Sequence, residues 1–439
     1  MRIKYLLGYA IFVMQMLTFL AISSSNILAQ DKEEEEIPKE QIPVEERETG
    51  DSFIENVGEL PGRIVTLPLQ LFFKGLSKVA GVIDYHEIVL RVTDWLTNED
   101  GTRKVRPIFT PVSGGGLIFI QDNLFKHGMK FRALGSYGTR TRRHFYGGLR
   151  DPQLFAPKFG LHLAGFYQRK PDEDFFGIGN DSRKADQTNY LHEESRFAID
   201  LISVPLSAVQ FSAGFSYSNV NVKRGRDPNQ PSLQDSASVF FDDPIPALFG
   251  AEMWSLLFKI YHDSRNATGH PTKGGEEYLS IEFSKELDGS EFGFLKYQID
   301  LRRYIELFYK RVLALKVRTE ITKNLAGQQI PFYRLAGLGG GDNLRGYRPV
   351  RFRDEDLMFV SAEYRFPIHS MVVATVFIEE GRVFSNIFDD FTFSDWKYSF
   401  GGGFRFRARS GNLTAIFDIA KSKEQIRFIF GLNTELRRF

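Results

Sequence analysis

The stretch Phe159-Gly-Leu-His-Leu-Ala-Gly-Phe-Tyr167 decides the fold of this chain. Its odd-numbered residues are apolar or glycine, whereas its even-numbered residues are mostly small or polar. Successive side chains of a β-strand point to opposite faces, so a period of two indicates a strand with one apolar face. The stretch therefore predicts a half-buried strand rather than a helix.

The same alternation continues on both sides of this stretch. It recurs in residues 117–119, 131–137, 197–201, 211–217, 313–317, 400–406 and 426–432, and more weakly in 278–282 and 359–363. A membrane-spanning strand needs about 9–11 residues, so a strand with its turn takes roughly 20 and residues 107–439 have room for about 16. We expect an all-β, antiparallel transmembrane barrel of about 16 strands. The polar stretches 169–187 and 223–243 are expected to be extracellular loops and 306–310 a periplasmic turn; a soluble sandwich or propeller is the alternative.

The amino-acid composition excludes several kinds of functional site. The 439 residues include 42 Phe, 17 Tyr and 39 Gly but no Cys, and the formal net charge is +1. The lack of Cys excludes disulfides, thiolate metal sites and Cys nucleophiles. Neither the balanced charge nor any binding motif indicates a nucleic-acid partner.

The N-terminal part of the chain differs from the rest. Residues 1–29 carry Arg2 and Lys4 before an apolar run, which predicts a signal peptide, with a membrane-anchoring helix as the alternative. Residues 30–60 are strongly acidic and are expected to be a disordered linker. Apolar residues recur every three or four positions in 61–106, which predicts a short helical segment, either periplasmic or acting as a plug. The barrel is expected to occupy residues 107–439.

A glycine-rich segment near the C-terminal end is more specific than the alternation. It reads Leu338-Gly-Gly-Gly-Asp-Asn-Leu-Arg-Gly-Tyr347, and a strand is expected soon after it. It resembles the BamA/TamA superfamily (bacterial surface antigen family) of outer-membrane assembly and secretion barrels. In that family a loop between the eleventh and twelfth strands folds into the lumen with a Val-Arg-Gly-Phe/Tyr tip. The residues Leu344, Arg345, Gly346 and Tyr347 match this tip, with Leu in place of Val.

The resemblance also implies a partner for Arg345. Family members pair this arginine with an acidic residue of the next strand, in a Phe/Gly-x-Asp-x-Gly pattern, and the candidate here contains Phe377, Glu379, Glu380 and Gly381. Either glutamate can serve, because a confined guanidinium favours a bidentate carboxylate and Gly346 permits close approach to the wall. We expect charge-restoring swaps at 345 and 379 to rescue an Arg345 variant in part.

Three other features bear on the resemblance. Residues 263–266 and 271–274 look like an Asp-x-Arg and Pro-x-x-Gly turn that recurs in these barrels, and the chain ends in Phe439, although this residue lies out of phase with the alternation of 426–432. Family members usually carry periplasmic POTRA domains of mixed strands and helices. Residues 30–106 read as acidic and helical instead, so we expect no POTRA domain.

Sequence motifs of enzymes are absent. There is no Gly-x-Ser-x-Gly, nucleotide-binding or His-Glu-x-x-His motif. Four histidines could in principle contribute to a lipase-like site: His144, His162, His262 and His270. We interpret them as ordinary strand or loop residues. We expect no catalytic residue, no metal and no cofactor.

The resemblance leads to a functional expectation. It implies a protein of the bacterial outer membrane that assists the insertion or translocation of proteins or lipids through a weak seam between the first and last strands. Its expected partners are outer-membrane lipids and client proteins or accessory subunits. The alternatives are a passive channel or surface antigen with the same barrel and an outer-membrane enzyme, which only fold analogy supports.

Overall fold

The computed structural model describes most of the chain beyond residue 97. The described residues are 98, 100–110, 114–125, 128–155, 158–203, 208–267, 269–369, 371–407 and 413–434. The predicted signal peptide (1–29), linker (30–60), most of the helical segment (61–106) and Phe439 lie outside them. Among the described residues, no helix has both the length and the apolar character needed to cross a membrane.

The described strands form one large antiparallel sheet of 16 strands and one small sheet of two. The large sheet contains β1 Arg103–Thr110, β2 Gly114–Leu124, β3 Met129–Tyr137, β4 Arg143–Phe155, β5 Phe159–Phe175, β6 Thr188–Ser203, β7 Val209–Arg224, β8 Gly250–Asp263, β9 Gly274–Glu286, β10 Gly293–Glu306, β11 Val312–Asn324, β14 Asp356–His369, β15 Val372–Phe384, β16 Lys397–Arg407, β17 Leu413–Ser422 and β18 Ile426–Thr434. The small sheet pairs β12 Ala336–Leu338 with β13 Phe352–Asp354. The short helices are α4 Leu233–Phe240, α5 Ile387–Asp390, η1 Thr139–Thr141, η2 Lys184–Asp186, η3 Phe308–Lys310 and η4 Phe332–Arg334.

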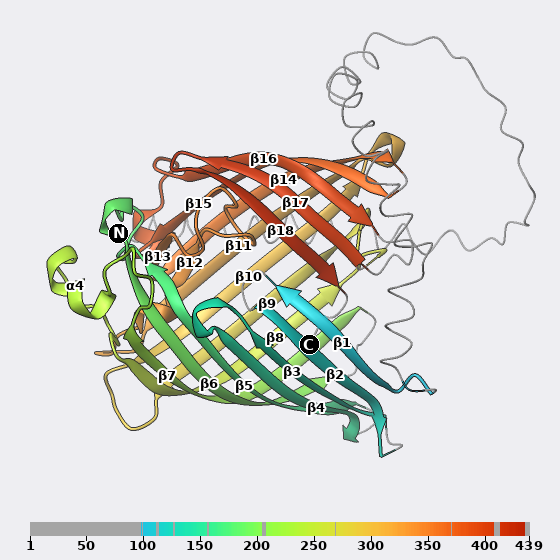
Figure 1. Ribbon diagram of the computed structural model, residues 1–439, viewed down its shortest axis with the longest axis horizontal. Helices are drawn as coiled ribbons and strands as arrows, with labels where there is room; N and C mark the ends of the chain where they lie inside the picture. Colours follow the sequence, from blue (N-terminus) through green and yellow to red (C-terminus); the bar gives the residue numbers. More distant parts are fainter. Residues whose placement is uncertain are drawn as a thin grey trace, which may run out of the picture. The chain divides into compact units, whose positions relative to one another are not determined.

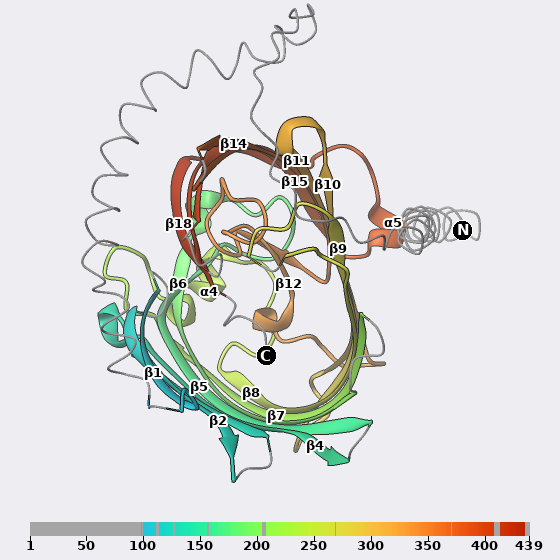
Figure 2. The same cartoon turned by 90° about the vertical axis from the view of Figure 1, so that its right-hand side faces the viewer.

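The large sheet curls into a barrel, as Figures 1 and 2 show. Each strand pairs with its neighbours in chain order, β14 following β11 directly, so β1 and β18 are the two edges of the sheet. The predicted all-β barrel of about 16 strands is therefore confirmed. Its first strand begins at Arg103, a few residues before the expected start at 107, and the glycines 114–116 and Leu117 belong to the second strand.

The connections differ between the two ends of the barrel. Long connections (176–187, 225–249, 325–355 and 385–396) share one end with the short turn at 423–425, whereas turns such as 307–311 lie at the other end. Outer-membrane barrels have short periplasmic turns and longer extracellular loops. The end with the long connections is thus the extracellular end.

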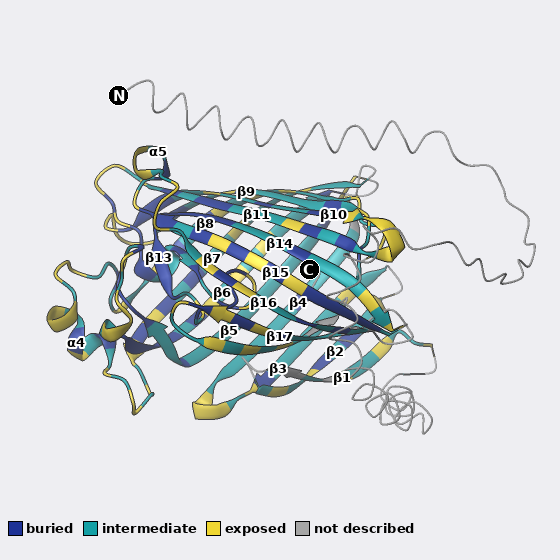
Figure 3. Cartoon of the chain, turned by 90° about the horizontal axis from the view of Figure 1, so that it is seen from above, coloured by how far each residue is buried: buried dark blue, intermediate teal, exposed yellow. Residues whose placement is uncertain are grey.

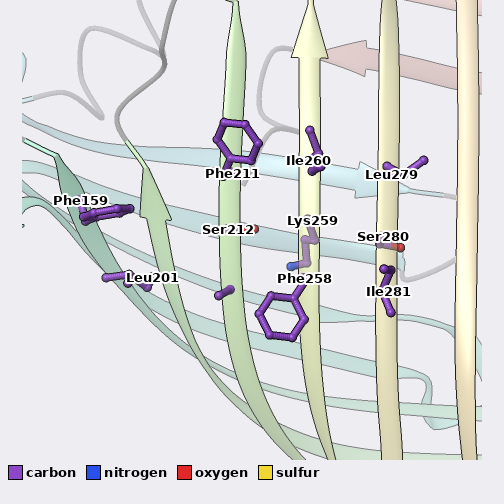
Figure 4. A pocket seen from close by; sticks show the side chains of 11 residues that line it. Phe159, Leu201, Phe211, Ser212, Phe258, Lys259, Ile260, Leu279, Ser280 and Ile281 are labelled. Carbon is purple, nitrogen blue, oxygen red and sulfur yellow. The ribbon is translucent and has the colours of Figure 1, made fainter.

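Exposure alternates along the strands of the barrel wall, as the yellow positions of Figure 3 show. Exposed apolar side chains such as Phe197, Phe215, Leu256 and Phe400 form the outer face. A shallow apolar hollow on this face is lined by residues of β5 to β9 near the periplasmic end, including Phe159, Phe211 and Phe258 (Figure 4). Such a band is what a wall in contact with lipid requires.

The connection 325–355 between β11 and β14 does not stay at the rim. Figure 2 shows β12 inside the ring of strands. Its apolar side chains form a buried cluster with residues of β14 and β15: Ala336, Leu338, Leu344, Tyr347, Phe352, Leu357, Phe359 and Val383. Because β11 and β14 are the eleventh and twelfth strands of the barrel, this lumenal loop (residues 325–355) has the place in the strand order that the resemblance implies.

Candidate functional site

The glycine-rich segment makes the turn that brings the lumenal loop against the wall. Gly339 and Gly340 have φ values of 116° and 112°, which disfavour other residues. A Cβ on Gly339 would lie 2.3 Å from the carbonyl oxygen of Arg348. The Asn343 side chain closes the turn, because its Oδ1 accepts a 2.9 Å bond from the Gly339 N–H and its Nδ2 donates to the Gly337 oxygen at 3.2 Å.

Beyond this turn, Arg345 is buried against the barrel wall. Its Nε donates to Glu379 Oε1 at 2.6 Å, and its backbone N–H donates to the other oxygen of the same carboxylate at 2.6 Å. Its Nη1 donates to Glu363 at 2.9 Å and to Asp418 at 2.8 Å. The guanidinium also lies over the Phe377 ring, 3.4 Å from its centroid. Arg345 is thus held by β14, β15 and β17 together.

Two further arginines complete the cluster around Arg345. Arg405 of β16 donates to Asp418 at 2.5 Å and to Glu363 at 3.1 Å, and Arg365 of β14 donates to Glu363 at 2.8 Å. The cluster therefore contains three arginines (345, 365, 405) and three carboxylates (363, 379, 418). Buried charges are tolerated when they are paired and hydrogen-bonded, so this balance is what keeps the cluster stable in the lumen.

The surroundings keep Arg345 charged. Burial alone lowers the pKa of Arg345, but the carboxylates of Glu379, Glu363 and Asp418 outweigh burial and raise it above its ordinary value. A charged, planar guanidinium can bind several carboxylates at once, which a lysine cannot do with the same geometry. Arg345 therefore acts as a fixed cross-link between the lumenal loop and the wall.

The neighbours of Arg345 have steric roles. A Cβ on Gly346 would lie 2.8 Å from the Ser399 Cβ and 2.9 Å from the backbone of Lys421, so only glycine fits against β16 and β17 there. Leu344 is fully buried, and Tyr347 packs edge-on against Phe352 with the ring centroids 5.3 Å apart. All four residues of the predicted tip thus lie in the lumen at the wall.

The two candidate partner glutamates have different positions. Glu379 is 3% exposed and also accepts a 2.8 Å bond from the Ser399 hydroxyl, whereas Glu380 is exposed on the opposite face of β15. The structure thus brings Arg345 to Glu379 and not to Glu380. Gly381 leaves room for Leu338, because a Cβ there would lie 2.7 Å from that side chain.

The lumenal loop is also attached to the last two strands. Ser422 donates to the Gly346 oxygen at 2.9 Å, and Arg427 of β18 donates to the backbone oxygens of Arg345 and Tyr347. Arg351 contacts both carboxylate oxygens of Glu424, in the turn between β17 and β18, at 3.0 Å. These contacts tie the loop to one edge of the sheet.

Sequence reasoning missed most of this cluster. Glu363, Arg365, Arg405 and Asp418 lie on three different strands, β14, β16 and β17, and only the folded barrel brings them together. Asp418 had a signal, since it is a single acidic residue inside an otherwise apolar run, residues 415–420. A buried charge of that kind needs a partner.

The predicted turn at 263–274 forms at the periplasmic end. Arg265 pairs with Asp263 at 2.9 Å and with Glu276 at 2.7 Å, and Asn266 accepts from the Thr272 N–H at 3.0 Å. Among the histidines weighed for catalysis, His162 contacts Tyr146 and Asp200, and His262 contacts Glu277. Within the described part of the chain, no group of His, Asp and Glu has the arrangement of a metal site.

Comparison with known proteins agrees with the barrel fold described above. The model of the Omp85 superfamily domain matches residues 123–436. Among solved structures, BamA from Haemophilus ducreyi lacking POTRA domains 1-3 is 19% identical, with a TM-score of 0.55 over 75% of this chain and 70% of that chain. CdiB from Acinetobacter baumannii is 10% identical (TM-score 0.47, 75% of this chain and 58% of that chain). CdiB from Escherichia coli is 12% identical (TM-score 0.48, 74% and 58%). No curated protein matches the chain.

Proposed function

The chain belongs to the Omp85 superfamily of outer-membrane β-barrels, and from this premise we propose that it assists the insertion or translocation of client proteins, or lipids, at the bacterial outer membrane. The site of action is the seam between β1 and β18. The lumenal loop, fixed by Arg345, holds one side of this seam. No chemical step is involved, and the clients are recognised through their backbone.

One observation carries this proposal. The edges of the large sheet are β1 and β18, and no ladder joins them among the described residues. An edge strand presents unpaired N–H and C=O groups, which are a template for another strand. A client strand can therefore add to the barrel by main-chain hydrogen bonds, the mode known as β-augmentation.

The sides of the seam are supported differently. The β17–β18 hairpin is bound to the lumenal loop through Ser422, Glu424 and Arg427. In β1, Lys104 pairs with Asp122 at 3.7 Å and Arg103 donates to Gln121 at 3.0 Å, and both partners belong to the neighbouring strand β2. Such an arrangement supports a fixed β18 edge and a β1 edge that moves to admit a client.

Disulfide locking of the seam tests the proposal. The chain has no Cys, so pairs can be introduced freely. One Cys is placed in β1, at Arg103 or Val105, and one in β18, at Phe428 or Phe430; all four positions are on the outer face, and several registers are sampled. After oxidation in cells, the protein and lipid composition of the outer membrane is compared with that of a strain depleted of the protein.

The matched control locks strands that are already paired. Ile118 and Leu134 are register partners in β2 and β3, so a disulfide there leaves the seam free. We expect seam locking to reproduce the depletion phenotype and the control to leave it unchanged. Efficient seam locking with a normal outer membrane would overturn the proposal and favour a passive channel or surface protein.

A further inference from the structure

Two arginines face each other on the outer wall of the barrel. Arg143 begins β4, Arg169 lies in β5, and the two are register partners. Both Nε atoms are buried without a hydrogen-bond partner, and neither guanidinium forms an ion pair with any residue in the described part of the chain. Like charges directly opposite each other on neighbouring strands destabilise a sheet. A site of this kind needs an anion from outside.

The arginine pair lies just above the lipid-facing band. The guanidinium of Arg143 is 5.9 Å from the ring centroid of Tyr137, which is 60% exposed. The neighbouring register pair on the same outer face is Phe145 and Tyr167, whose rings stack with their centroids 6.1 Å apart, as in an aromatic girdle. From Phe159 to Tyr167 the tilted strand β5 rises about 20 Å, close to the thickness of the apolar band of such barrels. The arginines are thus at the level of lipid headgroups at the extracellular end.

Nearby acidic residues are already engaged. Glu193 lies next to Arg169 on β6, but it accepts from Lys223 at 2.8 Å and from the Tyr167 hydroxyl at 2.5 Å. The loop arginines Arg140 and Arg142, by contrast, each contact Asp172, at 3.0 and 2.5 Å. The outward patch of Arg143, Arg169 and Lys223 therefore keeps a surplus of positive charge.

We propose that Arg143 and Arg169 bind the phosphate monoester of a glycolipid headgroup in the outer leaflet. A phosphate monoester carries a charge of about −1.5 to −2 at neutral pH, which matches two guanidinium groups. Arginine binds phosphate oxygens through paired N–H groups in a fixed geometry. The exposed Tyr137 ring lies beside the sugar, and the acyl chains run along the apolar wall below. The phosphodiester of a phospholipid, with a single charge, is the poorer match.

Binding of a purified glycolipid tests this site. The full chain in a non-ionic detergent is titrated with lipid A, a glycolipid with phosphate monoesters, and bound lipid is counted by native mass spectrometry. The variants are Arg143→Gln, Arg169→Gln and the double variant. Each single variant is expected to weaken binding about tenfold, the effect of losing one charge-assisted contact. The double variant is expected to bind no better than wild type binds the dephosphorylated lipid.

The control is Arg103→Gln, which removes an exposed arginine of β1 near the other end of the barrel. It should bind lipid A like the wild type, and the heat-dependent gel mobility of each variant verifies that it is folded. Unchanged binding by a folded double variant would overturn the site, as would an equal loss in the control. Equal affinity for phosphatidylglycerol, lost in the same variants, would overturn the assignment to a phosphate monoester.

Discussion

At the scale of single residues, Arg345 is the contact on which the lumenal loop depends. Its removal leaves Glu363, Glu379 and Asp418 facing only Arg365 and Arg405 in a buried site. We expect Arg345→Ala to destabilise the folded barrel by about 3–5 kcal/mol, the cost of an uncompensated buried charge. The measurement is the temperature at which the folded band disappears from an unboiled gel. An unchanged temperature would contradict the role of Arg345.

The same cluster revises the expected rescue by exchange of the two charges. A glutamate at 345 would face Glu363 and Asp418, which lie 2.9 and 2.8 Å from Arg345, so exchanging the charges of 345 and 379 should restore little stability. Arg345→Ala combined with Asp418→Asn restores the charge balance and should recover more. The motif identified Arg345 and a glutamate partner in sequence, but Glu363, Arg365 and Arg405 lie on β14 and β16 and carry no local signature.

At the scale of elements, the alternation located the strands but not always their faces. In residues 278–282 and 359–363 the alternation noted in sequence is weak, and the structure gives the reason. Phe359 and Glu363 lie on the lumenal face of β14, where the wall packs against the loop, so that face carries apolar and charged residues together. In β9 the outward-facing side chains, such as the exposed Ile281, are shifted by one position from the alternation that starts at residue 278. Because the loop fills the lumen, the apolar/polar alternation of these strands is weaker than it would be in the wall of an open channel.

The attachment of the lumenal loop to the β17–β18 turn is a second property of an element. Arg351 is 2% exposed, lies 4.5 Å from the ring centroids of both Phe176 and Phe352, and pairs with Glu424. We expect Arg351→Gln to loosen the loop, because both the ion pair and the ring contacts are lost. The readout is the rate at which a maleimide labels a Cys placed at the buried Leu344, which should rise about tenfold, as a loss of some 1.4 kcal/mol implies.

The matched variant in this experiment is Glu424→Gln in the same Leu344→Cys background. It removes the charge pair but leaves the ring contacts of Arg351 and its bonds to Ser182, at 3.0 and 2.9 Å, so labelling should rise less. Equal rates in the Arg351→Gln variant and its parent would show that Arg351 does not hold the loop.

At the scale of the whole molecule, the barrel is asymmetric about its seam. Each edge strand has one hydrogen-bonded neighbour, but β18 is also held from inside, where Arg427 donates to the backbone oxygen of Arg345 at 3.1 Å. Local opening costs less where fewer contacts must break. We therefore expect amides of β1 to exchange with deuterium about tenfold faster than those of β18, a difference of about 1.4 kcal/mol in opening free energy. Arg427→Gln should accelerate exchange in β18 alone. Equal exchange at both edges in the unmodified protein would mean that the lumenal loop does not bias the seam, and the moving edge would then have to be sought in both strands.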